Sequence, residues 1–365
     1  MTVSATDSVA PVTRLANANS TEWLYGLHVE RVSAVNVRCT ATAPCAICGQ
    51  VEAYRIFAIE GLPIWLVSCP SCQTGRLDPQ PSAEVLSQYY PQDYYGDAGA
   101  KFSGLVERLV RFVGSRHARF LARHLPPQAR VLDVGCGRGF ALQLLADCSL
   151  ECHGFEVTAD AVRGIDPRVR VRVATSLTQA AYPDAHFDEV IVWHVLEHVP
   201  DPRGLLVEIH RVLKPNGVLV VAVPNFASWQ ARWAGSAWFH LDPPRHLFHF
   251  PLAGLKRLLS ETGFHCSREH HFSLRQNPFG WIQSALNKFH GLPRNGIYVL
   301  LHRRAPHAPL PYSPAIRLLL RLLYCGLSPI GLGLSIVEAM FRSGATVHVV
   351  ARRDELSNTP SASDY

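Results

Sequence analysis

One short stretch, Val131 to Phe140, constrains the fold more than any other part of the chain. It reads Val-Leu-Asp-Val-Gly-Cys-Gly-Arg-Gly-Phe, so an apolar run leads into glycines at every second position. An apolar run that ends in glycines is typical of a buried strand, a tight turn and the start of a helix. Glycines in such a turn let the backbone approach a ligand closely, because no Cβ stands in the way. The stretch therefore predicts a ligand-binding strand–turn–helix unit.

The acidic residue Asp133 limits which ligand this turn accepts. Dinucleotide sites use the spacing G-x-G-x-x-G and bind a pyrophosphate at the helix N-terminus. Here the spacing is G-x-G-x-G, and Asp133 stands two residues before Gly135, where its carboxylate repels a pyrophosphate and attracts an ammonium group. S-adenosylmethionine, with an amine and a sulfonium, suits this arrangement. The stretch resembles motif I of the class I (Rossmann-like) methyltransferases; a strand–turn–helix without a ligand is the alternative.

Further residues take their expected roles from the order of the strands. Glu156 ends the second strand, about twenty residues after Asp133, where a carboxylate can accept both ribose hydroxyls. In related methyltransferases an acidic residue that follows the third strand binds the adenine amino group; Ser176-Leu177 stand at that place, so backbone groups would have to serve. The expected cofactor-binding residues are Asp133, Gly135, Cys136, Gly137, Gly139, Glu156, Ser176, Leu177 and His194.

The rest of residues 129–353 fits the same α/β class. Buried strands are expected up to Phe264–Phe272, and the closing, antiparallel seventh strand is expected at Gly344–Ala351. The fold class is therefore a Rossmann-like seven-stranded methyltransferase sheet, with an apolar helical insertion at about 273–343 before its last strand. A small zinc ribbon is expected to precede this domain.

The segment between Asn225 and Phe250 is longer than a simple connection between a strand and a helix. Asp242, Arg245 and His246 form a D-x-P-R-H pattern that resembles one branch of small-molecule methyltransferases. We expect these three residues to bind the substrate, Arg245 through an anionic acceptor group. His246 is the first candidate for the general base and His194, after the fourth strand, is the second. The alternative is that the three residues only hold the loop together.

Two C-x-x-C pairs predict a metal site. Cys45, Cys48, Cys69 and Cys72 provide two knuckles separated by twenty residues, and four thiolates close a tetrahedral Zn²⁺ site. Four thiolates leave no open coordination position, so the expected metal is structural. Residues 43–80 are accordingly expected to form the zinc ribbon. Few basic residues lie nearby, and no basic, aromatic stripe indicates a nucleic-acid partner.

The apolar stretch from Ile316 to Val337 raises the question of a membrane. About 20 such residues could span a bilayer, but Arg321 and Pro329 interrupt this one and the chain must return to the same sheet. An in-plane amphipathic helix or a re-entrant hairpin fits better, with peripheral membrane contact through 314–343. A buried core hairpin or a dimerisation hairpin is the alternative, so a homo-oligomer stays open.

Composition sets the outer limits. The 365 residues have 48% hydrophobic content and a formal net charge of +6, which allows one large domain and a small one. Residues 1–42 and 354–365 are expected to be flexible, and residues 81–128 to form connecting helices. The N-terminus shows no basic region followed by an apolar core, so the protein is expected in the cytoplasm, with the inner face of the membrane as an open alternative.

The expected function is S-adenosylmethionine-dependent methyl transfer to a small-molecule hydroxyl. The resemblance points to a sugar, polysaccharide or lipid-linked intermediate as the acceptor, although a fold does not fix a substrate. Three alternatives stay open: a C-methyltransferase for a sugar or quinone-like carbon, an RNA-modifying zinc-ribbon protein, and a membrane-docked scaffold with a vestigial cofactor fold.

Overall fold

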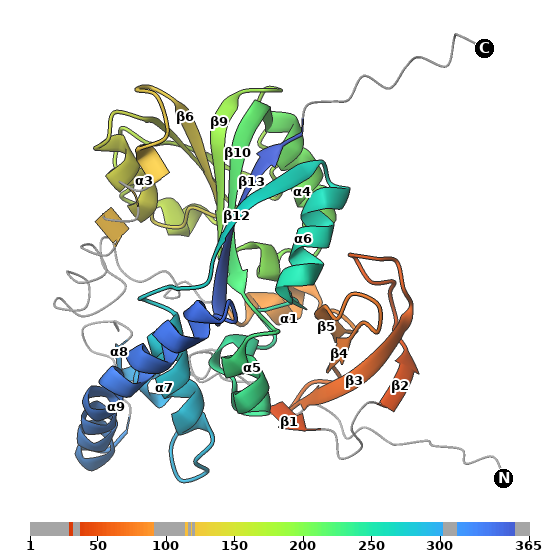
Figure 1. Ribbon diagram of the computed structural model, residues 1–365, viewed down its shortest axis with the longest axis vertical. Coiled ribbons are helices and arrows are strands. Elements are labelled where there is room, and N and C mark those ends of the chain that lie inside the picture. Colours follow the sequence, from red (N-terminus) through yellow and green to blue (C-terminus); the bar gives the residue numbers. More distant parts are fainter. Residues whose placement is uncertain are drawn as a thin grey trace.

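The computed structural model describes residues 29–31, 37–90, 114–115, 118, 121–301 and 312–354. A seven-stranded sheet runs through the middle of the protein (Figure 1). Its strands, in spatial order, are β8 (Arg170–Val173), β7 (Glu151–Glu156), β6 (Arg130–Val134), β9 (Phe187–Trp193), β10 (Leu213–Pro224), β13 (Thr346–Arg353) and β12 (Phe264–His270). Only β13 is antiparallel to its neighbours. The predicted Rossmann-like sheet with an antiparallel last strand is confirmed.

The central strands owe their position to continuous apolar runs. Val221 and Val223 of β10 and Val347 and Val349 of β13 are fully buried. Strands that are covered on both faces carry such unbroken runs instead of an alternating pattern. The covering helices are α3 (Phe140–Ala146), α4 (Pro202–Val212) and α6 (Leu252–Glu261). The chain order of strand, helix and strand therefore aligns the carboxyl ends of β6, β7, β9 and β10 at one edge.

The cysteine-rich part forms a second sheet that is larger than the sequence predicts. Its strands are β1 (Val29–Arg31), β2 (Val37–Thr40), β3 (Glu52–Ile59), β4 (Trp65–Ser68), β5 (Gly75–Asp78) and β11 (Phe248–His249). The boundary of the flexible segment at residue 42 was wrong, because β1 and β2 pair with β3. These short strands obtain their partner from residues beyond 50, which no local pattern reveals.

The same sheet joins the two predicted domains. Phe248 and His249 of β11 pair with Arg76 and Gly75 of β5, and the Leu77 amide donates to the Leu247 carbonyl. One hydrophobic core contains residues from the ribbon and from the seven-stranded sheet. The ribbon is therefore not an appended module, and its limit at residue 80 leaves out one of its strands.

The insertion before β13 is helical, as predicted. It contains α7 (Asn277–Asn287), α8 (Gly296–Leu301) and α9 (Pro314–Met340), at the lower left of Figure 1. The re-entrant hairpin was wrong, because α9 is one continuous helix through Pro329. A proline removes the hydrogen bond to the carbonyl four residues earlier. Both Pro329 and Cys325, which carries that carbonyl, are exposed, so water can replace the lost bond.

The remaining segments are covered only in part. The connection predicted at 81–128 contains α1 (Ala83–Ser87), which begins at the capping residue Ser82, and helical residues at 121–122. Residues 91–113 of that connection lie outside the described residues. Of the predicted tail, Asp354 donates its amide to the Gly263 carbonyl, and residues 355–365 lie outside the described part.

Candidate active site

The glycine turn follows β6 at the carboxyl edge of the sheet. Gly135, Gly137 and Gly139 have φ angles of 73°, 50° and 66°, in the left-handed region that favours glycine. A Cβ on Gly135 would stand 2.5 Å from the Val195 side chain, whereas a Cβ on Gly137 would meet nothing within 4 Å. The turn is therefore packed tightly on the β9 side and open above Gly137. This open face is where a ligand can approach the backbone.

Glu156 lies across the turn, as its predicted role requires. Its Oε2 accepts a hydrogen bond from the Gly137 amide at 2.9 Å, and its Oε1 accepts from the Val157 amide at 2.8 Å. The side chain is only 4% exposed. A carboxylate has about four acceptor positions, so hydroxyl groups can still donate to it. The carboxylate also links the end of β7 to the glycine turn.

Asp133 is a buried carboxylate beside a second one. Burial, and then the charge of Glu156, raise the pKa of Asp133 to about 7. Two carboxylates in one buried place are unfavourable unless a cation joins them. The amine of S-adenosylmethionine provides that cation. The donor set of this part of the site therefore fits the predicted cofactor.

The side chains of three other predicted cofactor-binding residues make contacts within the protein. The Cys136 side chain points into the core, since its Sγ would touch a Cβ placed on Gly154. Leu177 is 3% exposed and packs in the main core, so only its backbone faces any ligand. Ser176 accepts a hydrogen bond from the Gln179 amide at 3.2 Å. Adenine binding at Ser176 and Leu177 stays a prediction.

His194 stands directly after β9 with a strained backbone, at φ 54°. Its Nδ1 lies 3.1 Å from Glu197 Oε1, and Glu197 is 1% exposed. A hydrogen bond from Nδ1 to this carboxylate leaves the Nε2 lone pair free to accept a proton. The buried Nε2 has no hydrogen-bond partner among the described residues. Glu197 thus fixes the orientation of the His194 ring, and the role of His194 as a base stays a prediction.

The segment from His194 to His198 connects the cofactor turn to the D-x-P-R-H loop. Val195 packs on Gly135, and the Glu197 carbonyl accepts from the Leu247 amide at 2.8 Å. His198 Nδ1 lies 2.9 Å from the Arg245 carbonyl oxygen. Two segments that are about fifty residues apart in the sequence therefore meet at this edge. The sequence predicted both segments but not the contact between them.

Within the loop, Asp242, Arg245 and His246 are packed together. The Arg245 guanidinium donates to both Asp242 oxygens, at 3.0 and 2.5 Å, and Arg245 is 5% exposed. His246 Nδ1 donates to the His240 carbonyl at 2.9 Å, which leaves Nε2 as the acceptor nitrogen. Burial lowers the pKa of His246 well below its usual value. The loop therefore holds itself together and presents a neutral imidazole; acceptor binding stays a prediction.

Several residues near these segments had no role in the sequence analysis. Tyr90 places its hydroxyl 3.0 Å from His198 Nδ1. Trp193 stacks at a tilt on His348 of β13, with ring centroids 4.6 Å apart. Burial lowers the pKa of His240 to about 3, and its Nε2 has no partner among the described residues. Only their contacts across the fold reveal these residues, because none belongs to a local pattern.

In the part of the chain that the structure describes, two groups of side chains could hold a metal ion. The Sγ atoms of Cys45 and Cys72 lie 3.6 Å apart, and those of Cys48 and Cys69 lie 3.4 Å apart. All four ligand atoms lie within 4.8 Å of one another, close to the edge of about 3.8 Å of a ZnS₄ tetrahedron. The second group is Glu197, His198 and His246, whose ligand atoms also lie within 4.8 Å of one another.

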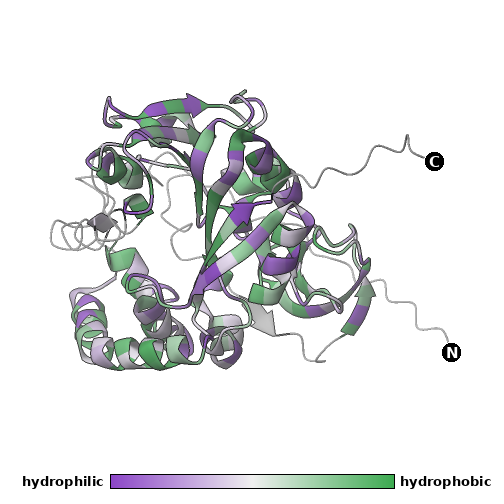
Figure 2. Ribbon diagram, turned by 45° about the horizontal axis from the view of Figure 1, so that its top comes forward, coloured by the Kyte–Doolittle hydropathy of each residue, from purple (hydrophilic) through white to green (hydrophobic). Residues whose placement is uncertain are grey.

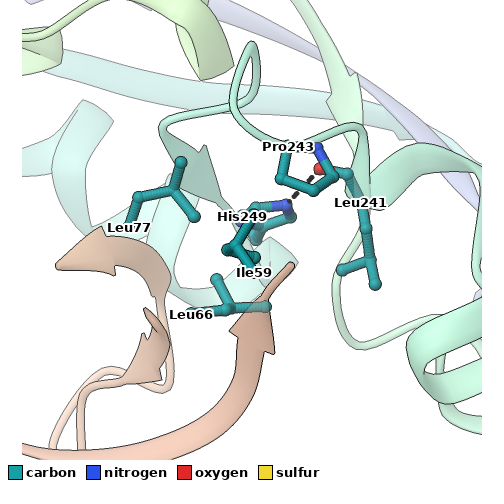
Figure 3. A pocket seen from close by; sticks show the side chains of 6 residues that line it. All are labelled: Ile59, Leu66, Leu77, Leu241, Pro243 and His249. Atoms are coloured by element: carbon teal, nitrogen blue, oxygen red, sulfur yellow. Dashed lines mark hydrogen bonds between the residues drawn. The ribbon is translucent and has the colours of Figure 1, made fainter. Parts of the chain in front are cut away.

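A pocket lies between the ribbon and the loop, away from the glycine turn. It is lined by Ile59, Leu66, Leu77, Leu241, Pro243 and His249 (Figure 3). Side chains of the ribbon sheet, including His249 of β11, face Leu241 and Pro243 of the loop there, and His249 Nε2 donates to the Leu241 carbonyl at 2.9 Å. Its apolar lining suits packing and not a charged cofactor.

A known protein family is similar to the part of the chain that forms this site. A family model described as a methyltransferase domain matches residues 105–268. This range holds the glycine turn, Glu156 and the D-x-P-R-H loop. The chain contains a methyltransferase domain. Within this domain, the class predicted from motif I is confirmed.

Two curated relatives are similar over parts of the chain. A probable S-adenosylmethionine-dependent methyltransferase of Mycolicibacterium smegmatis is 34% identical over 140 residues, 37% of this chain and 51% of the relative. A ubiquinone biosynthesis O-methyltransferase of Xanthomonas oryzae pv. oryzae is 35% identical over 131 residues, 33% of this chain and 55% of the relative. The chain thus spans about half the length of the curated relatives it matches. A solved S-adenosylmethionine-dependent methyltransferase of Archaeoglobus fulgidus aligns with a TM-score of 0.43 at 19% identity, covering 67% of this chain and 94% of that one.

Proposed function

We propose that the protein transfers the methyl group of S-adenosylmethionine to a hydroxyl of a small molecule. The observation that carries the proposal is that one short segment, residues 194–198, joins the cofactor turn to both candidate bases. Gly135 packs on Val195, the residue next to His194, and the same short segment reaches the loop of His246. A methyl donor on the turn and a proton acceptor therefore share one edge of the sheet.

The chain's own groups divide the work as follows. When bound, S-adenosylmethionine supplies an electrophilic methyl group on its sulfonium. Asp133 binds the amine, Glu156 accepts from the ribose hydroxyls, and the open face above Gly137 admits the backbone contacts. Holding both reactants in one orientation supplies much of the rate. His246 Nε2 removes the proton of the acceptor hydroxyl as the oxygen takes the methyl group, with His194 Nε2 as the second candidate.

The acceptor class rests on weaker support. The names of the Xanthomonas relatives describe O-methylation in ubiquinone biosynthesis, and an imidazole is suited to accept the proton of a hydroxyl. A sugar, polysaccharide or lipid-linked intermediate fits the same chemistry. Zn²⁺ in the four-cysteine ribbon is part of the proposal and has a structural role.

The test combines two measurements. Purified protein is incubated with methyl-labelled S-adenosylmethionine and a lysate of its source, and the labelled product is analysed by NMR for an O-methyl or a C-methyl group. An O-methyl product supports the proposal, and a C-methyl product contradicts it. Cofactor binding is measured separately by calorimetry. Failure to bind S-adenosylmethionine at all would overturn the donor as well.

His246→Ala tests the base. We expect turnover to fall by about 100-fold or more, since general-base catalysis contributes on this scale, while the affinity for S-adenosylmethionine stays within about twofold. His249→Gln is the matched control, because His249 is a buried histidine of the same loop that also donates to a carbonyl. Unchanged turnover in His246→Ala moves the assignment to His194.

A further inference from the structure

The outer side of α9 is the most apolar exposed surface among the described residues. Only Leu320, Gly331, Ser335 and Glu338 of its 27 residues are buried. The exposed apolar residues define the α9 apolar face: Leu318, Leu319, Leu322, Ile330, Leu332, Leu334, Ile336, Val337 and Met340, with Phe341 directly after the helix. Soluble proteins rarely leave such a large contiguous patch uncovered unless it binds something. Green, apolar ribbon is visible along these outer helices in Figure 2.

Buried polar contacts fix this helix against the body of the protein. Glu338 Oε1 accepts from the Gln230 amide at 3.0 Å, and its Oε2 accepts from Trp281 Nε1 at 3.1 Å. Gly331 lies against Ile282 of α7, and Leu320 lies against Gly296 of α8. These contacts hold α9 in one orientation, so its apolar face stays on the surface of the protein.

The length and apolar composition of α9 would allow it to cross a membrane. Its connections argue against crossing. The Ser343 carbonyl accepts from the Trp229 amide, and β13 begins at Thr346 between β10 and β12. The helix also packs on α7, where Gly331 lies against Ile282 and the Pro278 carbonyl. A helix held along one side by the protein can lie in the plane of a membrane surface but cannot span it.

The charges select the kind of surface. Glu338 is the only acidic residue of α9 and it is fully buried, whereas Arg317 and Arg321 are the basic ones and Arg321 is exposed. An apolar face on a helix that exposes one arginine and no carboxylate complements anionic headgroups. The exposed apolar residues also include the adjacent pairs Leu318-Leu319 and Ile336-Val337. This arc is broader than the a/d seam of a helix pair, so a second copy would leave part of it uncovered.

We propose that α9 docks the protein on the surface of an anionic lipid bilayer through the α9 apolar face. Since β13 begins beside the end of β10 and α9 directly precedes it, the docked face lies toward the carboxyl edge of the sheet (Figure 1). The candidate active site is at that same edge. Docking does not depend on the proposed methyl transfer.

Vesicle flotation tests the proposal. The full chain is mixed with phosphatidylcholine vesicles that contain about 30% phosphatidylglycerol, a density of negative charge sufficient to attract basic residues. The test variant is Leu322→Gln/Ile330→Gln/Met340→Gln, three changes at residues that are 63%, 58% and 76% exposed. We expect the wild type to float and the triple variant to lose about 100-fold or more in partition coefficient, because three apolar side chains leave the lipid.

The matched control is Val51→Gln/Val207→Gln, at residues 46% and 55% exposed on other surfaces, and it should float like the wild type. Thermal melting confirms that all variants are folded. A folded wild type that does not bind these vesicles overturns the proposal. So does a wild-type dimer in light scattering that the triple variant converts to a monomer, because the face then belongs to a second copy.

Discussion

At the scale of single residues, Asp133 exchanges stability for cofactor binding. Its folded pKa of about 7 lies above its ordinary value of 3.8, so ionisation costs the free protein roughly 4 kcal/mol. Because the pKa of Asp133 is higher in the folded state, this carboxyl group destabilises the folded state more and more as the pH rises toward 7. A bound cation removes the penalty. The residue that weakens the free fold is therefore the one that should tighten binding.

The affinity for S-adenosylmethionine should consequently depend on pH. Below pH 7 Asp133 must release a proton on binding, so we expect the dissociation constant to fall by up to about tenfold per pH unit and to level off above 7. Calorimetry between about pH 5.5 and 8.5 measures this slope. Asp133→Asn should bind more weakly, lose the slope and melt at a higher temperature at high pH. A wild-type slope of zero would contradict the assignment.

Glu197 has a different part at this scale, since it positions His194 through Nδ1. Glu197→Gln keeps the size of the side chain and removes its charge. We expect turnover to fall by roughly tenfold if His194 is the base, with the pH profile of turnover shifted. Glu197 also lies within 4.8 Å of His246, so His194→Gln is made as well: if His246 alone is the base, turnover and its pH profile should stay as in the wild type in that variant. The pH dependence of single-turnover rates separates the two cases, whereas a purely structural role would move only the melting temperature.

At the scale of elements, β11 carries the active-site loop onto the ribbon sheet. It is only two residues long, and only Leu247 separates it from His246. Its partner β5 follows the second cysteine pair. Any change that loosens the four-cysteine cluster therefore reaches the loop through one pair of strands. Through this contact, the proposed structural metal would have an indirect effect on the proposed chemistry.

Cys48→Ser or a strong chelator should loosen the ribbon and, through β5 and β11, the active-site loop. We expect loss of one bound zinc, a melting temperature lower by roughly 5 °C or more, and weaker turnover although no cysteine of the cluster lies in the site. Metal analysis and calorimetric melting measure the first two effects. Cys325→Ser is the control, because Cys325 is exposed on α9. Full activity of the metal-free protein would show that β11 holds the loop without the ribbon.

Elements also show where sequence reasoning succeeds. The structure brings Glu156 to the glycine turn and the two cysteine pairs to each other, as their spacing predicts, and the chemistry of both sites stays a prediction. The strand β11 could not be predicted, because Phe248 and His249 pair with residues more than 170 positions earlier. The continuity of α9 through Pro329 depends on which side of the helix faces water. The contact between Trp193 and His348 depends on the order of strands in the sheet.

At the scale of the whole molecule, β13 connects the edge strand β12 to the rest of the seven-stranded sheet. It lies between β10 and β12 and is buried along most of its length. A chain that ends after residue 343 should fail to fold, since two strands lose their central partner, whereas a chain that ends after residue 354 should keep the wild-type melting temperature. Expression as soluble protein and thermal melting test both truncations. A folded, soluble chain lacking β13 would mean that the sheet closes in another way.

The position of β13 also governs the order of events during synthesis. A ribosome delivers α9 before it delivers the strand that fixes the helix in place, and translation at about 5–20 residues per second leaves an interval of a second or more. During that interval β10 and β12 each have an unpaired edge, and the apolar helix α9 has no completed sheet beside it. The nascent chain is then at its most vulnerable to chaperone capture or self-association, just before β13 is available.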